Sequence, residues 1–148
     1  MKKVTNNILA HGMWIVDLVL AFWLAFLSRN VLLETLAKIY QKGSWSYPRW
    51  VVVIDRVYTI TVGLGWLVFM IVVEEYFRKG IQKGDLLKRF ARITGSVLLA
   101  IFAVDLILVW LQGIGSNDWL RWLILAAELG IGTALQVWAK TRPVPQPQ

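Results

Sequence analysis

The sequence predicts an all-α fold: an integral membrane four-helix bundle with cytoplasmic N and C termini and a short interfacial helix between spans one and two. Two observations predict it. Apolar residues make up 57% of the 148 residues, above the roughly 45–50% that is typical of soluble proteins. They also gather in four windows of about 20 residues, the length that an α-helix needs to cross a hydrocarbon core of about 30 Å.

The predicted spans are Ile8–Ser28, Val51–Val73, Ile93–Gly113 and Trp119–Ala139. In lipid every backbone N–H and C=O must be satisfied inside its own segment, so these windows are predicted to be helices. Because the whole chain has the length of one domain, residues 1–142 are predicted to form a single four-span membrane domain. Proline occupies every second position in residues 143–148, which are predicted to be a flexible tail.

The connection between the first two spans has an apolar pattern of its own. Apolar residues at positions 32, 33, 36, 39 and 40 recur at the spacing of one helical face. We therefore expect a short helix at residues 31–40 that lies in the membrane interface. Residues 43–48 are expected to end it and to turn the chain back. A tight turn at residues 115–118 makes spans three and four antiparallel neighbours.

Lysine and arginine are distributed unequally between the two sides of the predicted bundle. One side carries ten of them, namely Lys2, Lys3, Arg78, Lys79, Lys83, Lys88, Arg89, Arg92, Lys140 and Arg142. The opposite side carries four, namely Arg29, Lys38, Lys42 and Arg49. Because cytoplasmic connections are enriched in Lys and Arg, both termini are predicted to be cytoplasmic. The basic side is expected to contact the anionic headgroups of the cytoplasmic leaflet, in the inner or plasma membrane.

Each predicted span carries a carboxylate: Asp17, Asp55, Asp105 and Glu128. A charged residue at the centre of a span costs about 2.5–3.5 kcal/mol on insertion scales, and such residues normally face a bundle interior or water. At a rise of about 1.5 Å per residue, Asp17, Asp105 and Glu128 fall near the midplane at similar depth. We expect these three to meet as proton- or ion-binding groups. Asp55 and Arg56 lie higher and are expected to form a charge-tuning pair.

Polar and small residues share a helical face in the later spans. They are Thr94, Asp105 and Gln112 in span three, and Arg121, Glu128, Gly132 and Gln136 in span four. Both faces are expected to point into the bundle, where small residues allow close helix approach. A structural interpretation stays open beside the functional one: the acids are hydrogen-bonded to partners on other helices and hold the bundle together.

Two functions are compatible with this pattern. In the first, the chain is an accessory or structural subunit of a larger membrane complex. In the second, it is an oligomeric transporter or channel whose midplane carboxylates bind a proton or cation. We prefer the first, because no half-helix break of the kind that forms transporter sites interrupts a span. Either function implies partners in the membrane, a homo-oligomer or other subunits.

Other function classes lack their motifs. There is no H-E-x-x-H and no Gly-rich phosphate loop followed by lysine, so the chain is predicted not to be an enzyme. The basic residues lie between apolar runs rather than along one folded surface, which argues against nucleic-acid binding. With no cysteine and one histidine, His11, no metal site and no cofactor is expected. Ligation of a haem or pigment by His11 is left open.

Overall fold

The computed structural model describes residues 2–40, 49–113 and 118–141. They form four α-helices: α1 (Lys2–Tyr40), α2 (Arg49–Lys83), α3 (Leu86–Gln112) and α4 (Trp119–Thr141). All four are long and apolar enough to cross a membrane. The predicted all-α architecture of four spans is confirmed, and every predicted window coincides with part of one helix to within a residue.

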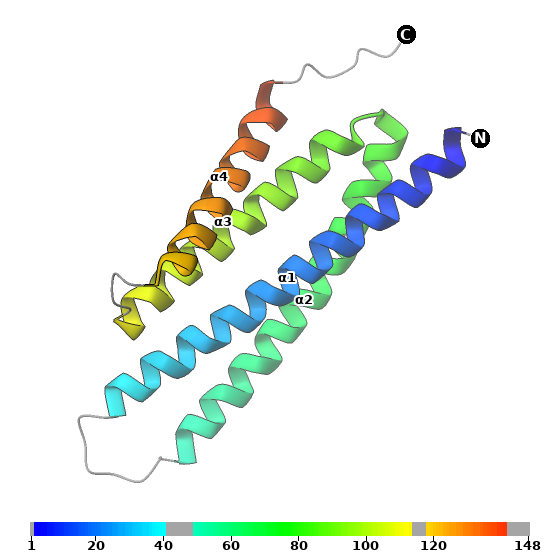
Figure 1. The fold of residues 1–148 in the computed structure, drawn as a ribbon. Coiled ribbons are helices and arrows are strands. Elements are labelled where there is room, and N and C mark those ends of the chain that lie inside the picture. Colours follow the sequence, from blue (N-terminus) through cyan, green and yellow to red (C-terminus); the bar gives the residue numbers. More distant parts are fainter. Residues whose placement is uncertain (1, 41–48, 114–117, 142–148) are drawn as a thin grey trace.

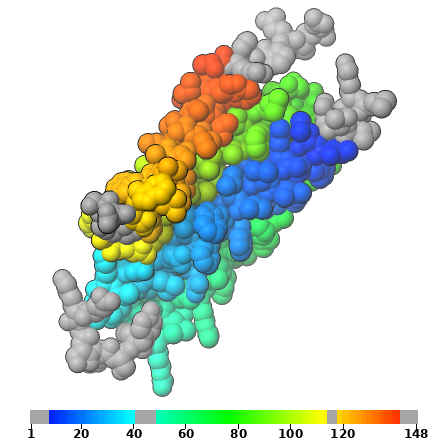
Figure 2. Space-filling model, viewed as in Figure 1, coloured from blue at the N-terminus to red at the C-terminus, as the bar shows by residue number. Residues whose placement is uncertain are grey.

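The helices are arranged as a three-helix core with a fourth helix on one flank. α1 packs against both α2 and α3, and α2 also contacts α3. Within the described residues α4 packs against α3 alone, on the side away from α2 (Figure 1). The molecule is elongated along the helices, and α1 and α4 occupy much of the face shown in Figure 2. The bundle is therefore not a closed ring of four helices.

The ends of the helices fall into two groups. The start of α1, the turn between α2 and α3 and the end of α4 lie at one end of the bundle, which we call the turn end (Figure 1). The end of α1, the start of α2, the end of α3 and the start of α4 lie at the other, which we call the far end. The chain therefore begins and ends its helical part on the same side. The assignment of that side to the cytoplasm stays a prediction.

The interfacial helix predicted at residues 31–40 is not a separate element, and this part of the prediction is corrected. α1 runs unbroken through it for 39 residues, or about 58 Å at 1.5 Å per residue. No glycine or proline occurs between residues 13 and 42 to end the helix. Of the apolar residues at positions 32–40, Leu36 is buried in the bundle, whereas Ile39 is 60% exposed. The predicted turn at residues 43–48, residues 115–117 of the predicted turn at 115–118 and the predicted tail at 143–148 lie outside the described residues.

The connection between spans two and three is mostly helical. α2 continues to Lys83 and α3 starts at Leu86, so only Gly84 and Asp85 lie between them. Gly84 has a φ of 69°, in the left-handed region where a side chain costs about 1–2 kcal/mol. The Asp85 N–H donates to the Gly80 carbonyl at 3.1 Å and closes the turn. The short turn holds α2 and α3 as a hairpin.

Two buried hydrophobic clusters hold the three-helix core. Near the turn end, Ala10 of α1 meets Val73 and Phe77 of α2 and Leu86 of α3. Further along, α1 and α3 pack through a second cluster that consists of Leu27, Val97, Ile101 and Leu108. Both clusters include α1 and α3, so these two parallel helices form the centre against which α2 and α4 are placed.

Candidate functional site

Asp17 lies at the contact between α1 and α3. Its side chain is fully buried, with 0% exposure. The Thr94 hydroxyl of α3 donates to Asp17 Oδ1 at 2.6 Å. Asp17 Oδ2 is also buried and has no hydrogen-bond partner among the described residues. The Thr94–Asp17 hydrogen bond therefore joins α1 to α3 and satisfies one of the two buried carboxylate oxygens.

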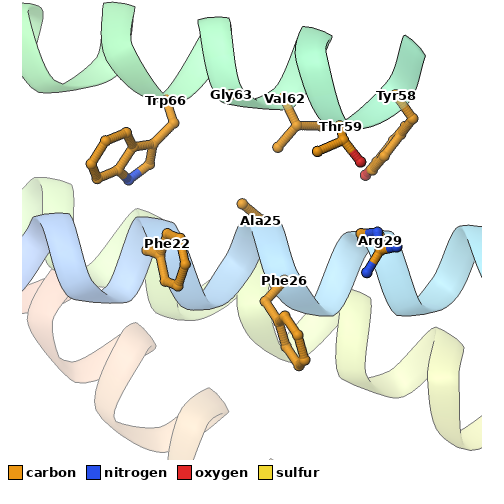
Figure 3. A pocket seen from close by; sticks show the side chains of 9 residues that line it. All are labelled: Phe22, Ala25, Phe26, Arg29, Tyr58, Thr59, Val62, Gly63 and Trp66. Atoms are coloured by element: carbon orange, nitrogen blue, oxygen red, sulfur yellow. The ribbon is translucent and has the colours of Figure 1, made fainter. Parts of the chain in front are cut away.

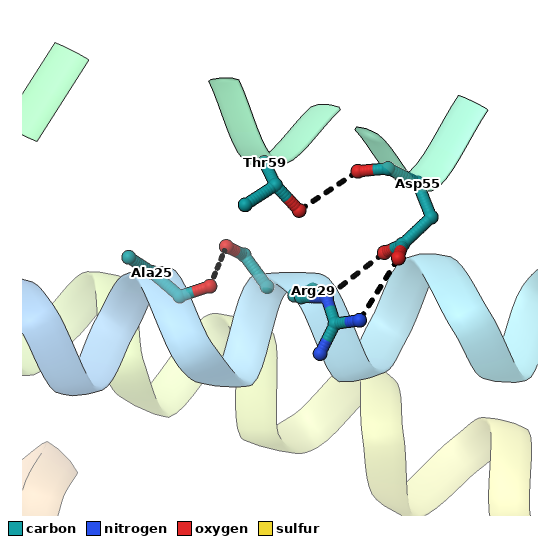
Figure 4. A network of polar contacts seen from close by, with 5 residues as sticks. Ala25, Arg29, Asp55 and Thr59 are labelled. Carbon is teal, nitrogen blue, oxygen red and sulfur yellow. Dashed lines mark hydrogen bonds and ion pairs between the residues drawn. The ribbon is translucent and has the colours of Figure 1, made fainter. Parts of the chain in front are cut away.

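Asp55 joins α2 to α1 through an arginine. Arg29 Nε and Nη2 donate to the two carboxylate oxygens of Asp55 at 2.8 and 2.9 Å (Figure 4). Parallel hydrogen bonds of this fork type are the strong form of an ion pair. Thr59 also donates to the Asp55 backbone carbonyl at 2.8 Å. The predicted pairing with Arg56 is thus replaced by one with Arg29, because neighbouring residues on a helix do not face each other.

Asp105 and Arg121 join α3 to α4 near the far end. Arg121 Nη2 lies 3.5 Å from Asp105 Oδ1, and its Nη1 donates to Gln112 Oε1 at 3.0 Å. Gln112 Nε2 in turn donates to Glu34 Oε1 on α1 at 3.3 Å. Glu128 of α4 lies close enough to Asp105 for the two charges to interact. One polar network therefore connects three of the four helices.

Glu128 of α4 is a carboxylate with an unsatisfied oxygen atom in the described part of the chain. Its Oε2 atom is buried and has no hydrogen-bond partner among the residues that the structure describes. Its electrostatic neighbour on α3 is Asp105, whose own cationic partner is Arg121. Two carboxylates and one arginine therefore share this part of the α3–α4 contact, and both carboxylates are ionised only at an electrostatic cost.

The structure divides the predicted trio of midplane acids. Asp105 and Glu128 come together, whereas Asp17 is bonded to Thr94. Asp105 follows Thr94 by eleven residues on α3, or about 16 Å along the helix. The expected single layer is therefore corrected to two sites at different depths. The estimate from span windows failed because α1 continues from the window end at Ser28 to Tyr40, so that the window did not give its depth in the bundle.

Gly132 and Gln136, two residues of the inward face predicted for span four, contact α3. Gly95 of α3 lies against Gly132 of α4, where a Cβ atom on Gly95 would meet the Gly132 carbonyl oxygen at 3.0 Å. One turn away, Gln136 Nε2 donates to the Arg92 carbonyl at 2.9 Å and to Ser96 Oγ at 2.7 Å. Close approach at small residues, with polar bonds beside it, is the usual way that helices associate in lipid.

Arg89 of α3 makes polar contacts with α2 that the sequence analysis did not predict. Its place in the basic connection predicts contact with the headgroups, yet its side chain is only 12% exposed. Arg89 Nε lies 2.8 Å from Asp85 Oδ1, and Nη1 donates to the Tyr76 carbonyl at 3.0 Å. The guanidinium also lies over the Tyr76 ring. The four-residue spacing of Asp85 and Arg89 was the available signal.

His11 lines a cavity of about 180 Å³ with Trp14 and Glu74 near the turn end. Within the described part of the chain, no group of three or more metal-binding side chains is found. The absence of a cofactor stays a prediction.

Comparison with protein-family models, with curated proteins and with solved structures found no match for this chain. The function must therefore be inferred from the chain itself, whose described part is a four-helix membrane protein with carboxylates at its helix contacts.

Proposed function

We propose that the chain is an accessory subunit of a larger membrane complex, whose embedded acids hold its own helices in a fixed arrangement. One observation carries this proposal. Each of the three most extensive helix contacts is bridged by one carboxylate and a partner from the other helix: Asp55 with Arg29, Asp17 with Thr94, and Asp105 with Arg121. No catalytic role and no cofactor are part of the proposal.

The distribution of these pairs favours a role in holding the helices together over a role in ion or proton conduction. A transport path requires binding groups that face one another or a shared wet space. Here Asp17 and Asp105 lie about 16 Å apart along the bundle, and each has its own partner on a neighbouring helix. Polar groups that are matched one by one across helix contacts act as ties, since bonds of this kind stabilise helix association in lipid.

The flanking helix α4 is the surface we assign to a partner subunit. It packs against α3 alone within the described residues. Its remaining surface exposes Ala126, Gly130 and Ala134 at four-residue steps. A Cβ atom on Gly130 would meet nothing within 4 Å. Small residues at this spacing suit the close approach of another transmembrane helix, so the proposed occupant is a single membrane helix of the complex.

The test is site-specific cross-linking from α4 in native membranes. A photoreactive residue in place of Ala126 is expected to capture one membrane partner in stoichiometric amount. Gly130→Leu is expected to abolish that product, because the larger side chain separates the helices. Gly65→Leu is the matched control, since Gly65 on α2 also has open space around its Cβ. The proposal fails if no product forms, if Gly130→Leu leaves it unchanged, or if the captured protein is a second copy.

A second candidate is proton or cation transport, which one specific observation favours. Asp17 Oδ2 and Glu128 Oε2 are buried acceptor atoms without a hydrogen-bond partner among the described residues. Such atoms suit a bound proton or cation. Purified protein in liposomes would then carry a pH- or cation-dependent flux that Glu128→Gln abolishes. Flux that is absent, or that persists in this variant, removes the acids from a transport mechanism.

A further inference from the structure

The cavity that contains His11 lies between α1 and α2 near the turn end. Its lining comes from α1 (Ala10, His11, Trp14) and from α2, where Glu74, Phe77 and Arg78 contribute. Ala10 and Phe77 are buried members of the hydrophobic cluster near the turn end. The Glu74 and Arg78 side chains are 51% and 76% exposed. The cavity therefore has an apolar inner wall and charged groups of both signs at its open side.

The charged side of this cavity lies at the edge of the predicted hydrocarbon layer. Glu74 directly follows the predicted span Val51–Val73. On α1, Trp14 donates its indole N–H to the Met70 carbonyl of α2 at 3.3 Å. Tryptophan is enriched at the boundary between hydrocarbon and headgroups. The charged side of the cavity is therefore at the level of lipid headgroups rather than of acyl chains.

Glu74 and Arg78 lie one turn apart on α2 and contact each other only loosely. Arg78 Nη1 is 3.9 Å from Glu74 Oε1, beyond the roughly 2.7–2.9 Å of a charge-assisted hydrogen bond. The neighbouring pair on the same helix is tight, with Lys79 Nζ 2.7 Å from Glu75 Oε1. Glu74 and Arg78 can therefore each bind a ligand group of opposite charge.

The larger cavity between the same two helices lacks such a pair of charges (Figure 3). It has a volume of about 240 Å³, lies further towards the far end, and is lined mainly by apolar and aromatic side chains such as Phe22 and Trp66. The charged residue of that lining is Arg29, whose guanidinium is bound by both carboxylate oxygens of Asp55. A charged headgroup is therefore better matched by the cavity near the turn end.

We propose that the cavity near the turn end binds the headgroup of one phosphatidylethanolamine molecule. The primary ammonium group of the lipid donates to the Glu74 carboxylate, and its phosphate accepts from the Arg78 guanidinium. At about 180 Å³ the cavity is smaller than the roughly 300–1,000 Å³ pockets of drug-sized ligands, so it holds the headgroup while the acyl chains lie along α1 and α2. A choline headgroup has no N–H to donate to Glu74, and a glycerol headgroup has no cation. The proposal does not depend on the accessory role.

The test is native mass spectrometry of the detergent-purified full chain with equal amounts of dioleoyl phosphatidylethanolamine, phosphatidylcholine and phosphatidylglycerol, which differ only in the headgroup. The wild type is expected to retain one phosphatidylethanolamine with about tenfold preference over each of the others. Equal retention of the three lipids would overturn the proposal. Preferred retention of phosphatidylglycerol would also overturn it, because that result reports a general attraction of anions to the basic turn end.

A competition experiment separates a lipid from a free solute with the same headgroup. Glycerophosphoethanolamine at the concentration of the lipid is expected to leave phosphatidylethanolamine bound, because it has no acyl chains to contact the helices. Displacement of the lipid by this solute would assign the cavity to a soluble ligand and overturn the proposal.

Glu74→Gln tests the ammonium contact and is expected to abolish the preference for phosphatidylethanolamine over phosphatidylcholine. Glu75→Gln is the matched control, since it removes the same charge at the next position. Glu75 lies outside the cavity lining and is paired with Lys79, so this variant is expected to keep the preference. An unchanged preference in Glu74→Gln, or an equal loss in the two variants, contradicts the assigned contact.

Arg78→Gln tests the phosphate contact. It is expected to lower the retained amount of phosphatidylethanolamine, because the phosphate loses its donor. Lys79→Gln removes one positive charge from the same turn of α2 and leaves the cavity lining intact, so it is expected to retain the lipid. Equal retention in these two variants would show that Arg78 does not hold the phosphate.

Discussion

At the scale of single residues, three of the four acids in the predicted spans have a polar partner on another helix, namely Asp17, Asp55 and Asp105. Asp17 faces Thr94 across the α1–α3 contact, and Asp55 faces Arg29 across the α1–α2 contact. The cause is the hydrocarbon of the lipid, which offers no water to an exposed polar group. Burial of the group against a partner on another helix is therefore the state of lower free energy. Such pairs specify which helix faces meet, in addition to stabilising the contact.

Thr94→Val is expected to weaken the α1–α3 contact. The substitution keeps the shape of the side chain and removes the hydroxyl that donates to Asp17 at 2.6 Å. It leaves a buried carboxyl with one fewer donor, so we expect the free energy of unfolding to fall by about 1–2 kcal/mol. Unfolding in mixed micelles, followed by far-UV circular dichroism, measures this change.

Thr61→Val is the matched control for that experiment. The Thr61 hydroxyl donates to the Val57 carbonyl of its own helix at 2.9 Å, and the residue is exposed. Its replacement removes a hydroxyl from the same type of residue without touching a helix contact. An equal loss of stability in the two variants would show that the Thr94–Asp17 bond does not tie α1 to α3.

At the scale of the helices, α4 depends on one contact for its position. It lies along α3, where Gly95 and Gly132 bring the two backbones close together. Polar bonds flank this crossing, from Gln136 at one side and from Arg121 at the other. In lipid there is no hydrophobic force between helices, so close packing and hydrogen bonds provide the association energy. The crossing therefore determines whether α4 stays attached.

Gly95→Ala is expected to loosen the attachment of α4. Its Cβ atom would meet the Gly132 carbonyl oxygen at 3.0 Å and two side-chain carbons of α4 at 3.2 Å. A backbone oxygen cannot move aside as a flexible side chain can, so the helices must separate. We expect a destabilisation of about 1–3 kcal/mol. Limited proteolysis and thermal unfolding in detergent report the change.

The control for this crossing is Gly130→Ala on α4, where the added Cβ atom meets nothing within 4 Å. Alanine is the better helix former in isolated helices, so this variant is expected to be neutral or slightly more stable. If Gly95→Ala were as stable as Gly130→Ala, the α3–α4 contact would not depend on close backbone approach.

At the scale of the whole molecule, the four helices place both ends of the helical part at the turn end. The excess of Lys and Arg on that side predicts that it faces the cytoplasm. The natural chain contains no cysteine, so a single introduced cysteine reports the location of one residue without background. This makes the orientation directly measurable.

Lys79→Cys and Asp118→Cys form a matched pair for the orientation. Lys79 lies on α2 near the turn end, and Asp118 precedes α4 at the far end. In intact cells a membrane-impermeant maleimide is expected to label Asp118→Cys and to leave Lys79→Cys unlabelled until the cells are permeabilised. The reverse pattern would place the termini outside and would contradict the predicted orientation.

The sequence by itself determined the number of helices and their place in a membrane. Each apolar run of span length can be predicted from its own residues, because insertion into lipid depends on the composition of the segment rather than on its neighbours. The same local periodicity correctly placed Gly132 and Gln136 on the face that α4 turns towards α3. The acids were also recognised as the residues that must have partners, since the cost of an isolated charge follows from residue type alone.

Only the tertiary structure decided which partners those acids have. Asp55 binds Arg29 rather than Arg56, and Asp17 binds Thr94 some 16 Å from the level of Asp105. Partner choice depends on the rotation and axial offset of whole helices. One residue of rotation, about 100°, turns a side chain towards a different neighbour. Those offsets arise from packing between distant segments, such as Gly95 against Gly132, and local sequence patterns do not encode them.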